Sequence, residues 1–206
     1  MKKNLLILFC IILSFNKINS QTNWVLLNPM TTNTGKDVEF VSTNIGYIIT
    51  TNELLETIDA GGTWLKKQNI SSGNDISFYN TTGYIIGNDG YVLKSIDNGA
   101  SWSQISTGFN SSFNTVNIID DDNIILSTSN SIVRTVNGGT TWESLNVPNS
   151  NVNKTFFTNT LIGHAICNGG TILKTVDGGQ NWYTIQGNNS FPSNCTVASG
   201  CITERP

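Results

Sequence analysis

The octet TVDGGQNW at residues 175–182 places a hydroxyl, a carboxylate, a glycine and a tryptophan at fixed spacing. Similar octets occupy residues 57–64 (TIDAGGTW), 95–102 (SIDNGASW) and 135–142 (TVNGGTTW). Their shared pattern is Ser or Thr, any residue, Asp or Asn, any residue, Gly, two further residues and Trp. Four copies require one explanation, so the pattern indicates an internal repeat before it indicates any chemistry.

The tryptophans of the chain mark the period of this repeat. They stand at intervals of 40, 38, 40 and 40 residues, at Trp24, Trp64, Trp102, Trp142 and Trp182. In the second repeat, short alternating segments occupy residues 75–79 (DISFY), 83–87 (GYIIG) and 92–95 (VLKS), and a fourth follows the tryptophan. Four short strands every forty residues, joined by Gly and Asn turns, are typical of a β-propeller blade. An open β-sandwich is the alternative, but it would not require such regular spacing.

The octet resembles the Asp-box, also called the bacterial neuraminidase repeat. The longer phrases at residues 87–102 (GNDGYVLKSIDNGASW) and 167–182 (CNGGTILKTVDGGQNW) resemble the repeats of the photosystem II stability/assembly factor family of β-propellers. This resemblance, over roughly residues 24–186, implies an all-β propeller of four-stranded antiparallel blades. We expect repeats over 21–186, with four complete blades and an N-terminal outer strand at Trp24.

The segment 187–206 is long enough for only a partial further blade or a C-terminal tail. We therefore expect an incomplete ring. Truncation is the favoured explanation, and capping of the arc by its own tail or by another copy is the alternative. An open edge of this kind would permit self-association, because repeats need neighbours to bury their faces.

Residues 1–20 have the three parts of a secretory signal peptide: a basic start, a short apolar run and a small residue, Ser20, before the expected cleavage. The prediction is a secreted protein, periplasmic, cell-surface or extracellular, without a membrane span. Cleavage would leave eight basic residues against 14 acidic ones, a net charge near −6. This balance argues against nucleic acid or an anionic membrane as the main partner.

The octet is explained as a tight hairpin turn. Side-chain oxygens can accept N–H bonds within the loop, the glycine can take a left-handed conformation, and the tryptophan packs beneath the turn. Asn137 replaces the carboxylate in the third copy, which keeps an acceptor but removes the charge needed by a metal ligand or general acid. The predicted structural residues are Thr57, Asp59, Gly61, Trp64, Ser95, Asp97, Gly99, Trp102, Thr135, Asn137, Gly139, Trp142, Thr175, Asp177, Gly179 and Trp182.

Catalytic readings are disfavoured. The resemblance to sialidases would imply three arginines that grip a substrate carboxylate, whereas the chain has only Arg134 and Arg205. Other Asp-box glycosidases need a carboxylate pair. Glu53, Asp75, Asp89 and Glu143 could supply one, but nothing in the repeat singles out two of them.

Several residues invite a metal or redox reading. His164 is the single histidine and occupies a strand position that holds Tyr47, Tyr84 and Ile124 in the other repeats, so a structural role is favoured. The run Asp120, Asp121, Asp122, Asn123 lacks the spacing of an EF-hand and is interpreted as a turn. We predict no metal site and no cofactor. Cys195 and Cys201 could form a disulfide in an oxidising compartment, which would leave Cys167 unpaired.

One row of residues supports a binding hypothesis. Lys94, Arg134 and Lys174 each precede the hydroxyl of an octet, with Glu56 at that position in the first copy. They could form a ligand-facing patch; alternatively, each covers a sheet edge or pairs with a carboxylate. The sequence thus favours an exported, non-catalytic binding or assembly module for a protein or a surface glycan or polymer. A carbohydrate-active enzyme other than a sialidase, or a fragment of one, is the alternative.

Overall fold

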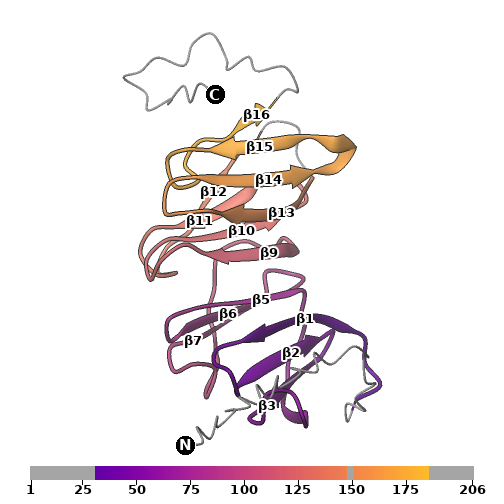
Figure 1. Ribbon diagram of the computed structural model, residues 1–206. Coiled ribbons are helices and arrows are strands. Elements are labelled where there is room, and N and C mark those ends of the chain that lie inside the picture. Colours follow the sequence, from indigo (N-terminus) through magenta and orange to yellow (C-terminus); the bar gives the residue numbers. More distant parts are fainter. Residues whose placement is uncertain (1–30, 148–150, 186–206) are drawn as a thin grey trace, which may run out of the picture.

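A computed structural model describes residues 31–147 and 151–185, which form four four-stranded antiparallel sheets (Figure 1). In each sheet the strands lie side by side in sequence order and are joined by hairpin connections. Four expectations fall outside the described residues: the signal peptide at 1–20, the strand at Trp24, the tail at 187–206 and the Cys195–Cys201 pair.

The first two blades follow directly on one another. Blade 1 contains β1 (Gly35–Phe40), β2 (Gly46–Thr50), β3 (Glu53–Thr57) and β4 (Leu65–Asn69). Blade 2 contains β5 (Asp75–Tyr79), β6 (Thr82–Ile86), β7 (Val92–Ser95) and β8 (Ser103–Gln104).

The last two blades repeat this order. Blade 3 contains β9 (Phe113–Ile118), β10 (Ile124–Thr128), β11 (Ile132–Thr135) and β12 (Glu143–Leu145). Blade 4 contains β13 (Val152–Phe157), β14 (Gly163–Cys167), β15 (Ile172–Thr175) and β16 (Tyr183–Ile185). The 3₁₀ turn η1 (Asn168–Gly170) connects β14 to β15. Across the described ranges, no helix is long and apolar enough to cross a membrane.

The first strand of each blade is the inner one, and these strands contact each other in succession, β1 with β5, β5 with β9, and β9 with β13. The blades are stacked face to face, and the first and last described blades lie at opposite ends of the stack (Figure 1). The sheets do not close into a ring within the described residues. The predicted all-β propeller architecture of four blades in an open arc is confirmed.

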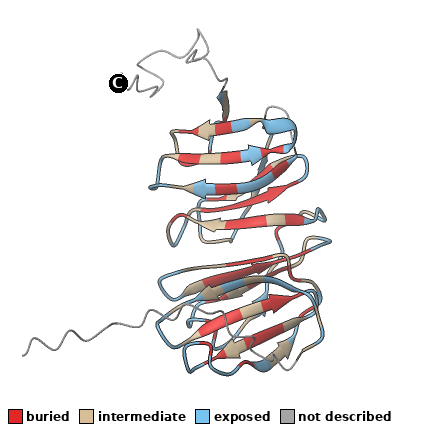
Figure 2. Ribbon diagram, turned by 45° about the vertical axis from the view of Figure 1, so that its right-hand side comes forward, coloured by how far each residue is buried: buried red, intermediate tan, exposed pale blue. Residues whose placement is uncertain are grey.

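Each hydrophobic core lies between two successive blades. We call the face that a blade turns toward the next blade its trailing face, and the opposite face its leading face. Tyr47, Ile49 and Leu54 on the trailing face of blade 1 pack against Ile76 and Ile85 on the leading face of blade 2. Equivalent cores join blade 2 to blade 3 and blade 3 to blade 4. Both faces of an interior blade are therefore buried, as the red strands of Figure 2 show.

Candidate functional site

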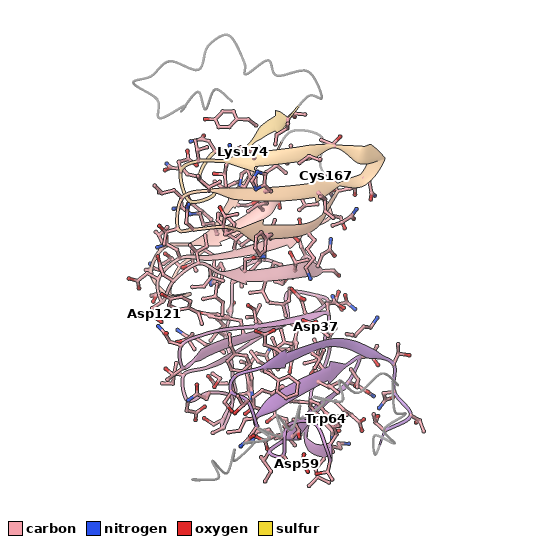
Figure 3. The ribbon with its side chains drawn as sticks, in the orientation of Figure 1. Asp37, Asp59, Trp64, Asp121, Cys167 and Lys174 are labelled. Atoms are coloured by element: carbon pink, nitrogen blue, oxygen red, sulfur yellow. The ribbon has the colours of Figure 1, made fainter. Side chains whose placement is uncertain are left out.

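Each Asp-box forms a closed turn between the third and fourth strands of its blade. In blade 1, Thr57 Oγ1 donates to Asp59 Oδ1 (2.8 Å) and accepts from the backbone N–H of Gly61 (2.9 Å). Asp59 Oδ1 also accepts from the backbone N–H of Thr63 (2.8 Å). The boxes that begin at Ser95 and Thr175 repeat these contacts. Asp59 lies with Trp64 at one end of blade 1, as Figure 3 shows.

Two consecutive residues of each turn adopt positive φ. In the first box these are Ala60 (φ 60°) and Gly61 (φ 87°), and Gly62 N–H donates back to Asp59 O (3.2 Å). Positive φ at both central residues is the requirement of a type I′ turn, which suits the twist of a hairpin. The equivalent pairs are Asn98 with Gly99, Gly138 with Gly139, and Gly178 with Gly179. The sequence predicted the second residue of each pair but not the first.

The third box builds the same turn without a carboxylate. Asn137 Oδ1 accepts from the Thr141 N–H (2.9 Å), and Asn137 Nδ2 donates to Thr141 Oγ1 (2.8 Å). In the fourth box the amide is on the other partner, because Asn181 Nδ2 donates to Asp177 Oδ2 (2.7 Å). The side-chain donor is thus the third residue of the third box and the seventh residue of the fourth box. In both boxes the third residue still accepts the backbone N–H of the seventh. The turn therefore requires an acceptor at this position and not a negative charge.

The box carboxylates are held in their ionised form. Hydrogen bonds from Thr63 and Thr57 lower the pKa of Asp59 to about 2. Those from Ser101 and Ser95 lower the pKa of Asp97 to about 2. Partial burial opposes ionisation of Asp177, but hydrogen bonds from Asn181 and Thr175 still lower its pKa. A general acid needs a proton to donate near neutral pH, and these groups do not hold one.

The box tryptophans pack edge-on against aromatic residues of the inner and second strands. Ring centroids lie 5.9 Å apart for Phe40 with Trp64 and for Phe157 with Trp182. Trp182 Nε1 also donates to the Gly179 carbonyl (2.9 Å). The indole rings thus support the turns from below.

The three cations of the row lie on the trailing faces of their blades, where they pair across strands with Tyr84, Ile125 and His164. Lys94 Nζ in blade 2 donates to the carbonyl of Gly138 in the blade 3 box (2.7 Å), and Tyr84 Oη donates to the same oxygen (3.0 Å). Arg134 forms an ion pair with Glu143 of its own blade (3.5 Å). Lys94 and Arg134 are each only half-exposed. The structure therefore gives these two residues contacts within the propeller, and a ligand patch at Lys94, Arg134 and Lys174 stays a prediction.

The four candidate glycosidase carboxylates are dispersed. Glu53 is in β3, where hydrogen bonds from Lys66, Thr31 and Asn33 lower its pKa to about 2. Asp75 begins β5, Asp89 is in the loop before β7, and Glu143 begins β12. Among the described residues, no hydrogen bond or ion pair joins any two of the four.

A different carboxylate contact lies on the inner strands, and the sequence did not reveal it. Asp37 Oδ2 accepts from the N–H of Ile76 in the next blade (3.2 Å), and Asp75 Oδ2 accepts from the N–H of Val116 (2.8 Å). Burial, together with the neighbouring Asp37 carboxyl, raises the pKa of Asp75 to about 7 despite the Val116 bond. Asp37 is labelled on blade 1 in Figure 3. The sequence could have indicated this contact only by showing that Asp37 and Asp75 occupy equivalent positions in successive repeats.

At the third interface this inner contact uses other side chains. Asn117 Nδ2 in blade 3 donates to the Thr155 carbonyl in blade 4 (2.8 Å), and the hydroxyls of Thr115 and Thr155 lie 3.2 Å apart. Lys154 stands in blade 4 where Asp37 and Asp75 stand in blades 1 and 2. All three described interfaces are thus joined near the axis by side chains of the inner strands.

The remaining candidate residues have structural surroundings. His164 pairs with Lys174 across β14 and β15, and partial burial together with the Lys174 charge lowers its pKa. Its counterpart in blade 3 is Ile125, which pairs with Arg134, and not Ile124 as the spacing suggested, because the strand register shifts the alignment by one residue. Asp120 Oδ1 accepts from the N–H groups of Asp122 (3.0 Å) and Asn123 (2.8 Å), which closes a local turn.

The described residues offer no cluster of metal ligands, and Cys167 is their one free cysteine. Within the described residues, no group of three or more His, Cys, Asp or Glu side chains could hold a metal ion. Cys167 is a buried free thiol, and burial raises its pKa.

Comparisons with known proteins agree with this geometry. Residues 16–111 match the family described as Photosynthesis system II assembly factor YCF48. No curated protein matches the chain. A structure of YCF48 bound to D1 peptide is 24% identical over 77% of this chain, with a TM-score of 0.63. A structure of YCF48 from Cyanidioschyzon merolae is 22% identical over 76% of this chain, with a TM-score of 0.62. An ancestral GH74 enzyme is 15% identical over 79% of this chain and 27% of its own, with a TM-score of 0.65.

The fold and the repeated turn together define an Asp-box β-propeller. Within that class the chain is YCF48-like, as the repeat phrases of the sequence indicated. It spans 55% and 57% of the length of the two YCF48 structures.

Proposed function

We propose that this chain is an exported, non-catalytic propeller that binds a polypeptide and acts in the assembly or retention of a complex. The observation that carries the proposal is the likeness to YCF48. The matching family is described as an assembly factor, and one of the similar structures is YCF48 bound to D1 peptide. The repeated box supports the same conclusion, because each carboxylate of the motif already accepts hydrogen bonds within its own turn.

The first test measures binding. The chain is immobilised and used to capture proteins from an envelope extract, in parallel with a Lys174→Glu variant and a Lys36→Glu control. Lys174 is the most informative of the three predicted patch cations, because Lys94 already bonds to the neighbouring blade and Arg134 to Glu143. Loss of a captured protein with Lys174→Glu but not with Lys36→Glu supports the patch. Equal capture by all three proteins removes the patch, and absence of any specific polypeptide ligand opposes the proposal.

Export is tested separately. The N-terminal segment should direct the chain out of the cytoplasm, and N-terminal sequencing of the exported protein should begin near Gln21. Recovery of the intact chain in the cytoplasm would refute this part of the proposal and leave polypeptide binding to be judged by the capture experiment.

A carbohydrate-active enzyme is the second candidate. Its support is the fold likeness to GH74 enzymes and the elevated pKa of Asp75, since a raised carboxyl pKa is a property of glycosidase acids. However, Asp75 binds the Val116 N–H and adjoins Asp37, an arrangement that also explains its pKa as an interblade contact. Hydrolysis of a glycan that disappears with Asp75→Asn or Glu143→Gln would favour the enzyme over the binding module.

A further inference from the structure

The trailing face of blade 4 carries exposed apolar side chains and has no neighbouring blade among the described residues. Ile166 is 53% exposed and Ile172 43% exposed, whereas their counterparts on blade 2, Ile86 and Val92, are each 0% exposed against blade 3. Phe156 on β13 is also exposed. Exposed segments along the strands of blade 4 are visible in Figure 2. A propeller face of this composition is normally buried by a neighbouring blade.

The leading face of blade 1 also exposes apolar side chains, and it is the kind of face on which a trailing face packs inside the chain. Val38 on β1 is 51% exposed, while its counterparts Ile76, Val116 and Thr155 are buried against the preceding blade. Phe40 is also exposed, and Ile48 is half-buried. The opening is limited to the inner two strands, because Leu55 on β3 is buried.

The polar groups on the two faces match as well. Inside the chain, Tyr47 Oη donates to the carbonyl of Asn98 (2.8 Å), and both Tyr84 Oη and Lys94 Nζ donate to that of Gly138. These acceptors occupy the first positive-φ position of the next blade's box, which in blade 1 is Ala60.

On blade 4 the corresponding donors are His164 and Lys174, since the His164–Lys174 strand pair is equivalent to the Tyr84–Lys94 pair. In the described part of the chain, no bond from another blade reaches the Ala60 carbonyl. Blade 4 therefore offers donors, and blade 1 offers the acceptor that such donors bind at the first two internal interfaces.

From this match we propose that two copies of the chain associate head to tail, with blade 4 of each copy packed on blade 1 of the other. Contacts of this heterologous kind close into a ring when the rotation permits. Two sets of the four described blades give eight, which is within the usual range for propellers of about four to eight blades, whereas three sets would exceed it.

One position departs from the internal pattern. Lys154 occupies the place where Asp37 and Asp75 accept a backbone N–H from the next blade, and an ammonium group cannot accept that bond. We therefore expect the contact between copies to be weaker than the contacts within the chain, and the assembly to depend on concentration.

The test is the mass of the purified chain by analytical ultracentrifugation over a range of concentrations. The wild type should reach the mass of two copies. Val38→Asp and Ile166→Asp, on opposite faces, should each raise the dissociation constant by about tenfold or more. Ile96→Asp is the matched control, because Ile96 is equally apolar and 70% exposed but lies on the box turn of an interior blade. Circular dichroism establishes that each variant is folded.

Mixing distinguishes head-to-tail packing from other arrangements. A mixture of Val38→Asp and Ile166→Asp contains one pair of intact faces, so it should recover two-copy mass that neither variant shows alone. A wild type that stays monomeric at every concentration overturns the proposal. So does a dimer that survives Val38→Asp but not Ile166→Asp, which would indicate two blade 4 faces packed together.

Crosslinking of the unmutated protein provides a second measurement that does not depend on the folding of variants. Copies labelled with ¹⁴N and ¹⁵N are mixed and treated with an amine crosslinker. Mixed-isotope crosslinks should join Lys174 of one copy to the blade 1 lysines, Lys36, Lys66 or Lys67, of the other. Mixed crosslinks confined to Lys174 with Lys174 would contradict head-to-tail packing.

Discussion

Lys94 and Gly138 lie in adjacent blades, and the ammonium of the first donates a 2.7 Å hydrogen bond to the carbonyl of the second. Gly138 is a left-handed residue of the third Asp-box (φ 63°), so this bond attaches a neighbouring sheet to the turn itself. The box thus serves two purposes, because its side chains close the hairpin and its carbonyl receives a donor from the preceding blade.

Replacing Lys94 with Met should weaken the contact between blades 2 and 3. The variant keeps most of the aliphatic stem but loses the bond to Gly138 and the cation above the Tyr84 ring, 5.6 Å from its centroid. We expect the free energy of unfolding to fall by about 0.5–1.5 kcal/mol, the usual net value of one hydrogen bond. Chemical denaturation measures it, and Lys36→Met, at an exposed site, should leave stability unchanged.

Asp177→Asn and Asp177→Ala should differ clearly. Asparagine keeps an acceptor for the Asn181 N–H, as Asn137 does for Thr141, whereas alanine leaves that N–H without its partner. We expect the alanine variant to lose about 1–2 kcal/mol of stability and the asparagine variant to lose less than half of that. Equal losses in thermal denaturation would mean that the charge, and not the acceptor, holds the turn.

Ala60→Gly should stabilise the first box. Ala60 has φ 60°, a conformation that strains a residue with a Cβ, and the third and fourth boxes have glycine at this place. The expected gain is about 0.5–1 kcal/mol after allowance for the greater freedom of glycine in the unfolded chain. The control is Ala100→Gly in the second box. Ala100 follows the two positive-φ residues of that box and does not itself have positive φ, so no gain in melting temperature is expected.

The pKa of Asp75 predicts a pH dependence of stability. Its folded value of about 7 lies above the unfolded value of about 3.9. Between these two pH values the folded chain binds more protons than the unfolded chain, so the free energy of unfolding falls as pH rises from about 4 to about 7. Above about pH 7 the stability that the protonated Asp75 contributes is lost. Asp75→Asn, which keeps an acceptor for the Val116 N–H, should flatten this slope in denaturation measured at several pH values. An unchanged slope would contradict the assignment.

The sequence predicted the blades well because the repeat is local. The spacing of the tryptophans, the alternation of the strands and the glycine of each turn are properties of one stretch of about forty residues. The replacement of Asp by Asn137 was informative for the same reason, since it compares equivalent positions directly. The fold and the chemistry of the turn could therefore be argued without knowing how the blades pack.

The contacts between blades could not be predicted in this way. Nothing in the sequence around Lys94 indicates that its partner is the Gly138 carbonyl, 44 residues later, because a backbone acceptor carries no residue signature. The elevated pKa of Asp75 depends similarly on Asp37, 38 residues earlier, and on burial that only packing produces. The row of cations was visible as a pattern, but its surroundings required the structure.

Because each blade packs only on its neighbours, the blades differ in how firmly they are held. Blades 2 and 3 each have two neighbours, whereas blades 1 and 4 each have one in the described chain. The molecule then behaves as a linear chain of coupled units in which opening begins at the ends and proceeds inward. Amide protons of β14 should exchange with solvent sooner than those of β6 or β10, and occupation of an end face by any partner should slow exchange from that end first.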